Sequence, residues 1–196
     1  YKFIAVFGKL RLFMKTKKPI IALMYDFDKT LCPKDMQEYG FIPSVHESAE
    51  SFWQDATNLA KQEKMDAILT YMYLMIKKSK ATDQSLRRET FVALGKDIEL
   101  FLGVEDWFDR ITKFGDDYGV TIEHYIISSG LKEIIEGSPI SKKFKEIYAC
   151  EFHYDASGAA DWPKQAVNYT NKTQFLFRVN KGILDISKSS ELNKYV

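Results

Sequence analysis

The sequence has little cysteine and no excess of either charge. Cys32 and Cys150 are the only cysteines among 196 residues, and neither lies in a Cys-x-x-Cys or Cys/His pattern typical of a bound metal. Sparse cysteine of this kind favours reduced thiols, so we expect a cytoplasmic location. Lys and Arg number 28 against 27 for Asp and Glu, and this balance argues against nucleic acid as a partner.

Long hydrophobic runs are also missing. The longest, 65–76, is interrupted by Asp66 and Thr70 and is shorter than the roughly 20 residues that cross a bilayer. We therefore expect no membrane partner. The first 13 residues lack the apolar centre and the small-residue cleavage site of a signal peptide. Because Met14 resembles a natural start, we expect residues 1–13 to be an upstream extension.

The order of apolar patterns predicts an α/β protein with a parallel sheet. Three short apolar runs, 20–25, 124–127 and 146–152, have the length and composition of buried strands. A long stretch with helical spacing of apolar residues separates the first two runs. A turn-rich segment at 156–160 follows the third run and indicates a hairpin. Strands that alternate with helices are typical of a parallel sheet covered by helices.

Two carboxylates follow the first predicted strand. Asp26 and Asp28 lie two residues apart, so both leave an extended strand on the same side. Their mutual repulsion favours a cation between them, and a hard ion such as Mg²⁺ suits carboxylate oxygens. A bare Asp-x-Asp pair is nevertheless more often a solvated turn.

Small polar residues and a lysine supply two further clusters. Ser128, Ser129 and Gly130 lie before a predicted helix, whose free N–H groups could hold a phosphate, although a plain helix cap is the alternative. Lys172 opens a later helix, where a cation is disfavoured unless an anion lies in front of it. Lys181 is a competing candidate, and a solvent-facing lysine is the alternative. Because ligands of parallel sheets bind at the carboxyl ends of strands, we expect the functional residues to lie there.

Taken together, these motifs resemble those of the haloacid dehalogenase-like (HAD) hydrolase superfamily. Residues 26–31, DFDKTL, are similar to its first motif, DxDx[TV][LV], after an apolar strand. Residues 126–130, IISSG, are similar to its second motif, and Lys172 is similar to the lysine of its third. The long helical segment lies where the phosphoserine-phosphatase-like branch of the superfamily carries a helical cap.

The resemblance implies a fold and an activity. The fold is a Rossmann-like parallel sheet core with an inserted α-helical cap. Residues 14–33 and 121–196 would form the core, and residues 34–120 the cap. The activity is that of a Mg²⁺-dependent phosphatase acting on a small phosphorylated substrate through an aspartyl-phosphate.

The resemblance also gives each matching residue a role. Asp26 would be the nucleophile, and Asp28 would protonate the leaving group and then activate water. Mg²⁺ would be held by the Asp26 carboxylate and the backbone carbonyl of Asp28. Lys172 would neutralise charge on Asp26 and the phosphate. The expected phosphate site, in which Thr30 supports the loop geometry, consists of Thr30, Ser128, Ser129, Gly130 and Lys172.

One motif of the superfamily is missing. Its fourth motif is an acidic cluster that supplies further Mg²⁺ ligands, yet only Asp185 and Glu191 follow Lys172, and Asp185 stands too close to that lysine. We therefore expect a core truncated at its C-terminal end, with the nucleophile strand left at a sheet edge and weak Mg²⁺ binding. Alternatives are a catalytically incompetent binding module, a phosphomutase or a dehalogenase. Asp28 favours phosphoester hydrolysis, because dehalogenation has no alkoxide to protonate.

Overall fold

A computed structural model of the chain describes residues 5–8, 18–84 and 86–194. Its centre is a five-stranded sheet in the order β1-β2-β3-β4-β5. The three central strands are parallel, and the two outer strands run antiparallel to their neighbours. The predicted parallel α/β core and the predicted hairpin are confirmed. The strands are β1 (Ala5–Gly8), β2 (Ile20–Tyr25), β3 (Thr121–Leu131), β4 (Glu146–Tyr154) and β5 (Ala160–Gln165).

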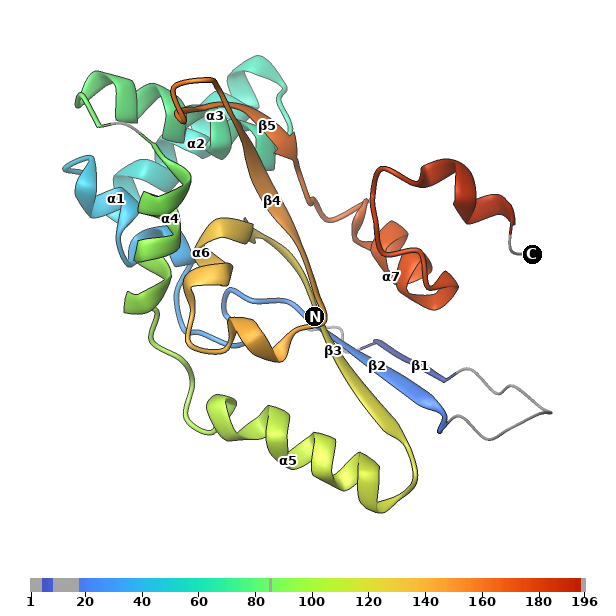
Figure 1. Cartoon of the computed structure of the whole chain (residues 1–196). Coiled ribbons are helices and arrows are strands. Elements are labelled where there is room, and N and C mark those ends of the chain that lie inside the picture. The colour runs from blue at the N-terminus through green and yellow to red at the C-terminus, as the bar shows by residue number, and fades with distance from the viewer. Residues whose placement is uncertain (1–4, 9–17, 85, 195–196) are drawn as a thin grey trace.

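Helices surround the sheet in the described part of the chain. They are α1 (Phe41–Ser44), α2 (Ala49–Glu63), α3 (Ala67–Ala81), α4 (Arg88–Leu94), α5 (Val104–Asp117), α6 (Lys132–Gly137) and α7 (Lys172–Lys181), with 3-10 helices at Met36–Glu38, Gly95–Asp97, Ser141–Lys143 and Ser189–Lys194. Helices α1 to α4 gather beyond the carboxyl ends of β2 and β3, and the β4–β5 hairpin reaches up beside α3 (Figure 1). The helices therefore stand over the edge of the sheet where ligands of parallel sheets bind.

Side-chain caps fix where the two longest helices over the strand ends begin. Ser48 precedes α2, and its hydroxyl accepts a hydrogen bond from the N–H of Ser51 at 3.1 Å. Asp66 precedes α3, and its carboxylate accepts from the N–H groups of Ile68 and Leu69 at 2.9 and 3.0 Å. Each cap satisfies N–H groups that a helix cannot pair internally.

The outermost strand was not expected from the sequence. β1 pairs antiparallel along β2, with Ala5 opposite Met24 and Gly8 opposite Ile21. The expectation that β2 would form an edge of the sheet is therefore wrong. Apart from 5–8, the expected upstream extension, residues 1–13, lies outside the described residues.

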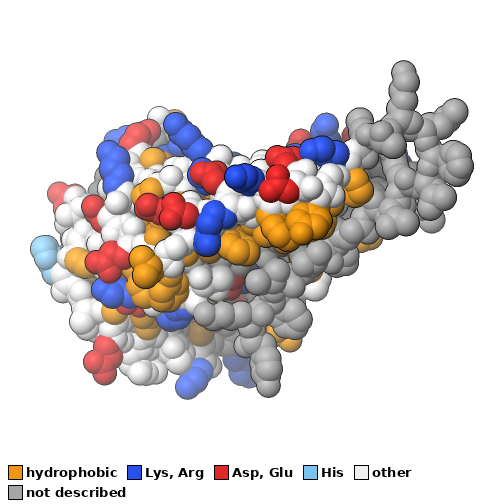
Figure 2. Space-filling model, turned by 90° about the horizontal axis from the view of Figure 1, so that it is seen from below, with side chains coloured by type: hydrophobic (Ala, Val, Ile, Leu, Met, Phe, Trp, Pro, Cys, Tyr) orange, Lys and Arg blue, Asp and Glu red, His pale blue; other side chains and the backbone are white. Residues whose placement is uncertain are grey.

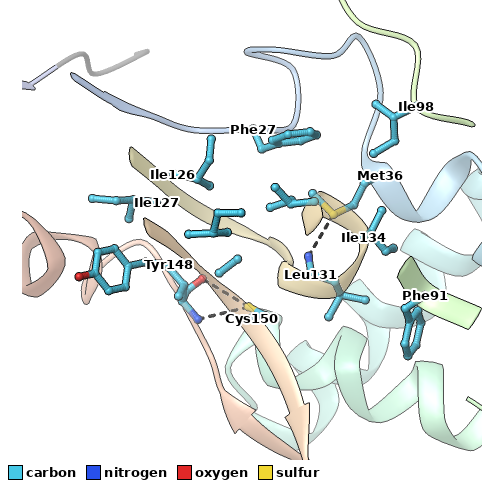
Figure 3. Close-up of a cluster of buried hydrophobic side chains, with 14 of the residues drawn as sticks. Phe27, Met36, Phe91, Ile98, Ile126, Ile127, Leu131, Ile134, Tyr148 and Cys150 are labelled. Atoms are coloured by element: carbon cyan, nitrogen blue, oxygen red, sulfur yellow. Dashed lines mark hydrogen bonds between the residues drawn. The ribbon is translucent and has the colours of Figure 1, made fainter. Parts of the chain in front are cut away.

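The hydrophobic core joins the loop after β2 to the end of β3. Phe27, Met36, Ile126 and Leu131 are all fully buried. Figure 3 shows the Met36 side chain directed at Leu131, whose backbone N–H donates a hydrogen bond to the Met36 sulfur at 3.0 Å. Burial of such side chains is the main source of stability, and here it also fixes the relative positions of the two strand ends.

Helix α5 packs along the sheet although it lies within the expected cap segment, 34–120. The ring of Phe108 on α5 meets that of His124 on β3 edge to face, with centroids 5.1 Å apart. α5 is thus associated with β3 rather than with the helices over the strand ends. The division of the chain into a core and a cap stays a prediction.

The described surface carries both signs of charge. Seen from below, acidic and basic side chains lie next to one another and next to hydrophobic ones (Figure 2). This mixture agrees with the net charge of +1. Within the described residues, no helix has the length and hydrophobicity needed to cross a bilayer.

Buried His124 predicts a loss of stability in mild acid. Its ring nitrogens hydrogen-bond to the hydroxyls of Tyr25 at 3.0 Å and Thr112 at 3.1 Å. Burial lowers the pKa of His124, the nearby charge of Lys143 lowers it further, and that of Asp109 opposes this shift. The unfolded chain takes up the proton near pH 6.5. Stability is therefore fully present above about pH 6.5 and falls as the pH drops from there toward the lowered pKa of the folded state.

Urea unfolding midpoints at about pH 7.5 and about pH 5.5 would check this prediction. We expect the wild-type chain to lose more stability between the two values than the His124→Gln variant, which cannot take up the proton. An equal loss in both chains would contradict it.

Candidate functional site

Residues from both sequence motifs meet at the carboxyl ends of β2 and β3. Asp26 and Asp28 follow β2, and Ser128 and Ser129 lie near the end of β3. All four line a single cavity of about 290 Å³. Lys172, in the first turn of α7, reaches the same place, with its Nζ 2.9 Å from Oδ2 of Asp26.

The carboxylate of Asp26 is held on both oxygens. Oδ1 accepts a hydrogen bond from the N–H of Phe27 at 2.9 Å, and Oδ2 accepts from Lys172. The Asp26 side chain is 46% exposed and that of Lys172 is 29% exposed, so the pair lies at the cavity mouth rather than in the core. Lys181, the competing candidate, lies at the far end of α7 with its Nζ 5.4 Å from the ring of Phe177.

Asp28 lies in an environment that favours its protonated form. Burial raises the pKa of its carboxyl group to about 8, and the carboxylates of Asp35 and Asp26 add to the rise. The N–H of Met36 donates to Oδ1 of Asp28 at 3.0 Å and opposes the shift only in part. A carboxylic acid that keeps its proton near neutral pH can donate it to a departing oxygen.

A tight turn joins the two carboxylates to the rest of the loop. The N–H of Thr30 donates to the carbonyl of Phe27 at 3.2 Å, and the N–H of Leu31 donates to the same carbonyl at 2.8 Å. Lys29 in this turn adopts left-handed backbone geometry, with φ at 55°, and its ammonium pairs with Asp35 at 2.6 Å. Thr30 is not among the cavity-lining residues, and its place in the expected phosphate site stays a prediction.

Ser128, Ser129 and Gly130 belong to a strand rather than to the start of a helix. β3 runs through these residues to Leu131, and α6 begins at Lys132, one residue later than the helix predicted from the sequence. A phosphate site at these residues stays a prediction. The Ser128 hydroxyl is fully buried and accepts a hydrogen bond from the N–H of Gly130 at 3.0 Å. The Ser129 carbonyl accepts from the hydroxyl of Tyr71 at 2.7 Å, which ties α3 to the strand end.

Gly130 permits the close approach of the two loops, although it does not itself line the cavity. A Cβ atom at this position would collide with the Met36 methyl group and would lie 2.7 Å from the Met36 sulfur. It would also lie 3.0 Å from Oδ2 of Asp28. A side chain here would push the acid away from the strand end.

Sequence reasoning missed five residues that line the same cavity. They are Asp35, Gln37, Trp53, Ile68 and Tyr71. Trp53 on α2 and Tyr71 on α3 pack edge to face at 5.9 Å, and the Trp53 indole N–H donates to Glu38 at 3.3 Å. The short sequence distance of Asp35 and Gln37 from the first motif is the one signal that could have drawn attention to them.

Comparison of the sequence with known proteins gives limited information. No known family profile matches the chain. An uncharacterized protein of Borreliella burgdorferi is 28% identical in an alignment that covers 86% of this chain and 67% of that protein.

Comparison of the structure is more informative. A HAD family hydrolase from Salmonella enterica serovar Typhi superposes with a TM-score of 0.58 at 17% identity, over 84% of this chain and 51% of its own. A substrate-bound phosphoserine phosphatase superposes with a TM-score of 0.57 at 14% identity, over 85% of this chain and 72% of its own. A phosphoserine phosphohydrolase-like protein from Francisella tularensis superposes with a TM-score of 0.55 at 18% identity, over 85% of this chain and 73% of its own.

The chain has the HAD-like fold. It spans about half the length of the Salmonella hydrolase, with 51% of that chain covered. At identities of 14 to 18% the likeness establishes the architecture, and the chemistry of this HAD-like chain has to be argued from its own residues.

The residues expected to hold Mg²⁺ offer few ligands. Within the described parts of this HAD-like chain, no group of three or more His, Cys, Asp or Glu side chains is arranged to bind a metal. Asp185 is exposed in the loop after α7, where it accepts hydrogen bonds from the N–H and hydroxyl of Ser187 at 2.9 and 2.7 Å. Mg²⁺ binds through one or two carboxylates and keeps several waters. Asp26 and Asp28, whose repulsion helps to raise the pKa of Asp28, fit a loosely held ion of this kind.

Proposed function

We propose that this chain is a Mg²⁺-dependent phosphatase that hydrolyses a small phosphomonoester through an aspartyl-phosphate. One observation carries the proposal. The ammonium of Lys172 lies 2.9 Å from Asp26, 146 positions away in the sequence, at the cavity that Asp28 and Ser128 also line. A nucleophile, an acid and a charge-neutralising cation are thus brought together where a parallel sheet binds its ligands.

The residues suggest a two-step reaction. A carboxylate oxygen of Asp26 attacks phosphorus, the bond between phosphorus and the leaving oxygen breaks, and Asp28 gives its proton to that oxygen. Asp28, now a carboxylate, takes a proton from a water that attacks the phosphorus of the intermediate, which frees Asp26 and inorganic phosphate. Lys172 and the hydroxyl of Ser128 stabilise the charge on the phosphoryl oxygens in both steps. Mg²⁺, held by the Asp26 carboxylate and the Asp28 carbonyl, would add further charge neutralisation.

Hydrolysis of p-nitrophenyl phosphate tests the proposal directly. We expect turnover by the wild-type chain that depends on added Mg²⁺ and stops with a chelator. Because the proposed site gives the ion only the Asp26 carboxylate and the Asp28 carbonyl, the Mg²⁺ concentration required should be high and binding measured by titration calorimetry should be weak. A chain that shows no Mg²⁺-dependent turnover would contradict the phosphatase assignment.

The two candidate lysines give a matched pair of variants. Replacing Lys172 with Met removes the cation beside Asp26 and should lower kcat on p-nitrophenyl phosphate by about a hundredfold, the usual size of a lost charge-stabilising group. Lys181→Met alters the same helix at its other end and should change kcat less than about threefold. Equal losses in the two variants would show that Lys172 has no special part in the reaction.

A second candidate is a module that binds a phosphorylated compound without turning it over. The observation in its favour is that, among the described residues, no group of three or more His, Cys, Asp or Glu side chains is arranged to bind a metal. Binding of a phosphomonoester with no release of phosphate at any Mg²⁺ concentration would favour this candidate. The small phosphorylated partner and the cytoplasmic location stay predictions under both candidates.

A further inference from the structure

The amide of Gln37 is an unusual feature of the cavity wall. Gln37 is only 2% exposed, and its Oε1 has no hydrogen-bond partner among the described residues. The residue nevertheless lines the cavity that contains Asp26 and Asp28. Buried side-chain oxygens are nearly always hydrogen-bonded, so an unpaired acceptor at a cavity wall points to a partner that the free chain does not contain.

The residues on both sides of Gln37 are held by hydrogen bonds. Met36 is fixed on one side, because its N–H donates to Asp28 at 3.0 Å and its sulfur accepts from Leu131 at 3.0 Å (Figure 3). Glu38 is fixed on the other side by the indole N–H of Trp53 at 3.3 Å. The 3-10 helix Met36–Glu38 therefore holds Gln37 at the cavity in a set position relative to Asp28.

The size and the other lining residues of the cavity limit which ligands can contact the Gln37 amide. Its volume of about 290 Å³ suits a phosphoryl group with a short organic part. Trp53, Ile68 and Tyr71 give the organic part an apolar flank. Asp35 supplies a further carboxylate, whose charge is partly offset by the ammonium of Lys29 at 2.6 Å.

We propose that Gln37 is a specificity-determining residue whose Oε1 accepts a hydrogen bond from a hydroxyl or amino group on the organic part of the substrate. The proposal rests on the proposed phosphatase function and adds a substrate class to it. That class is the short phosphomonoesters that carry a hydrogen-bond donor a few bonds from phosphorus. A site built around such a contact discriminates strongly against the analogue that lacks the donor.

Matched substrates test the proposal through activity. O-phosphoethanolamine differs from ethyl phosphate by one amino group, and glycerol 1-phosphate differs from propyl phosphate by two hydroxyls. The wild-type chain should prefer the donor-bearing member of each pair. Gln37→Leu should lower kcat/KM for that member by about tenfold or more and leave ethyl phosphate and p-nitrophenyl phosphate within about threefold. Gln54→Leu, at an exposed glutamine on α2, should leave kcat/KM for all five substrates unchanged. A uniform loss on every substrate in Gln37→Leu would overturn the proposal.

A second measurement tests the contact between Gln37 and the ligand without relying on catalytic activity. The side-chain amide signals of Gln37 can be assigned in a nitrogen–proton NMR spectrum by their loss in Gln37→Leu. Without Mg²⁺, titration of the wild-type chain with O-phosphoethanolamine should move these signals, and ethyl phosphate should leave them in place. Amide signals that move with neither compound, or equally with both, would overturn the role of Gln37. Absent turnover of p-nitrophenyl phosphate would instead count against the phosphatase function, whatever the amide signals show.

Discussion

Replacement of Asp26 by Asn is expected to reduce hydrolysis of p-nitrophenyl phosphate by at least about a thousandfold. An amide cannot attack phosphorus to form the proposed intermediate. The substitution nearly preserves the shape of the side chain, and the amide oxygen can still accept the hydrogen bond from the N–H of Phe27, seen at 2.9 Å. The loss of the ion pair with Lys172 should cost little stability, because the pair is partly exposed. The expected result is therefore a folded, inactive chain.

A stability measurement and a control variant show whether the lost activity reflects the lost nucleophile. Thermal unfolding of Asp26→Asn should remain within a few degrees of the wild-type value, so that lost activity is not lost structure. Asp185→Asn serves as the control, because Asp185 is an exposed carboxylate whose contacts are with Ser187 in its own loop. Asp26→Asn activity within tenfold of wild type would exclude Asp26 as the nucleophile.

The sequence predicted the parts of the site that depend on local order along the chain. Asp26 and Asp28 could be assigned because they follow a short apolar run, and the strand that this run forms, β2, has the predicted bounds. Lys172 could be assigned because a cation at a helix start is electrostatically unfavourable without an anion before it. Parallel strands place their carboxyl ends at one edge, and so Ser128 could be expected near both acids.

The missed parts depend on packing between distant segments. Trp53 and Tyr71 have the spacing of ordinary core residues, and only the packing of α2 against α3, with α3 tied to the end of β3, makes them cavity walls. Gln37 carries no motif, because its importance comes from a missing hydrogen-bond partner that a sequence cannot show. The end of β3 was expected at 127, but its pairing with β4 resumes at Leu131 after an irregularity, and this shift moved Ser128 from a helix start into the strand.

Replacement of Gly137 by Ala should give the largest loss of stability. α4 and α6 meet closely there, and a Cβ atom on Gly137 would collide with the backbone carbonyl oxygen of Val92. Gly95 faces the same contact, where its own Cβ would collide with the carbonyl oxygen of Ile134 and lie 2.6 Å from the Cα of Gly137. Backbone atoms cannot turn aside as a side chain does, so the helices would have to separate. We expect either substitution to lower the free energy of unfolding by about 3 kcal/mol, the upper range for overpacking.

The contact between α4 and α6 lies close to the candidate site, so the loss of stability in these variants tests whether this contact supports the site. α6 directly follows the end of β3, which carries Ser128, and α4 belongs to the group of helices over the strand ends. Gly40→Ala is the matched control, because the three atoms nearest to the added Cβ all belong to the side chain of Leu94, which can rotate, and the substitution should cost about 1 kcal/mol. Urea unfolding measures all three variants. If Gly137→Ala were no less stable than Gly40→Ala, the close approach of α4 and α6 would not contribute to the stability of the fold.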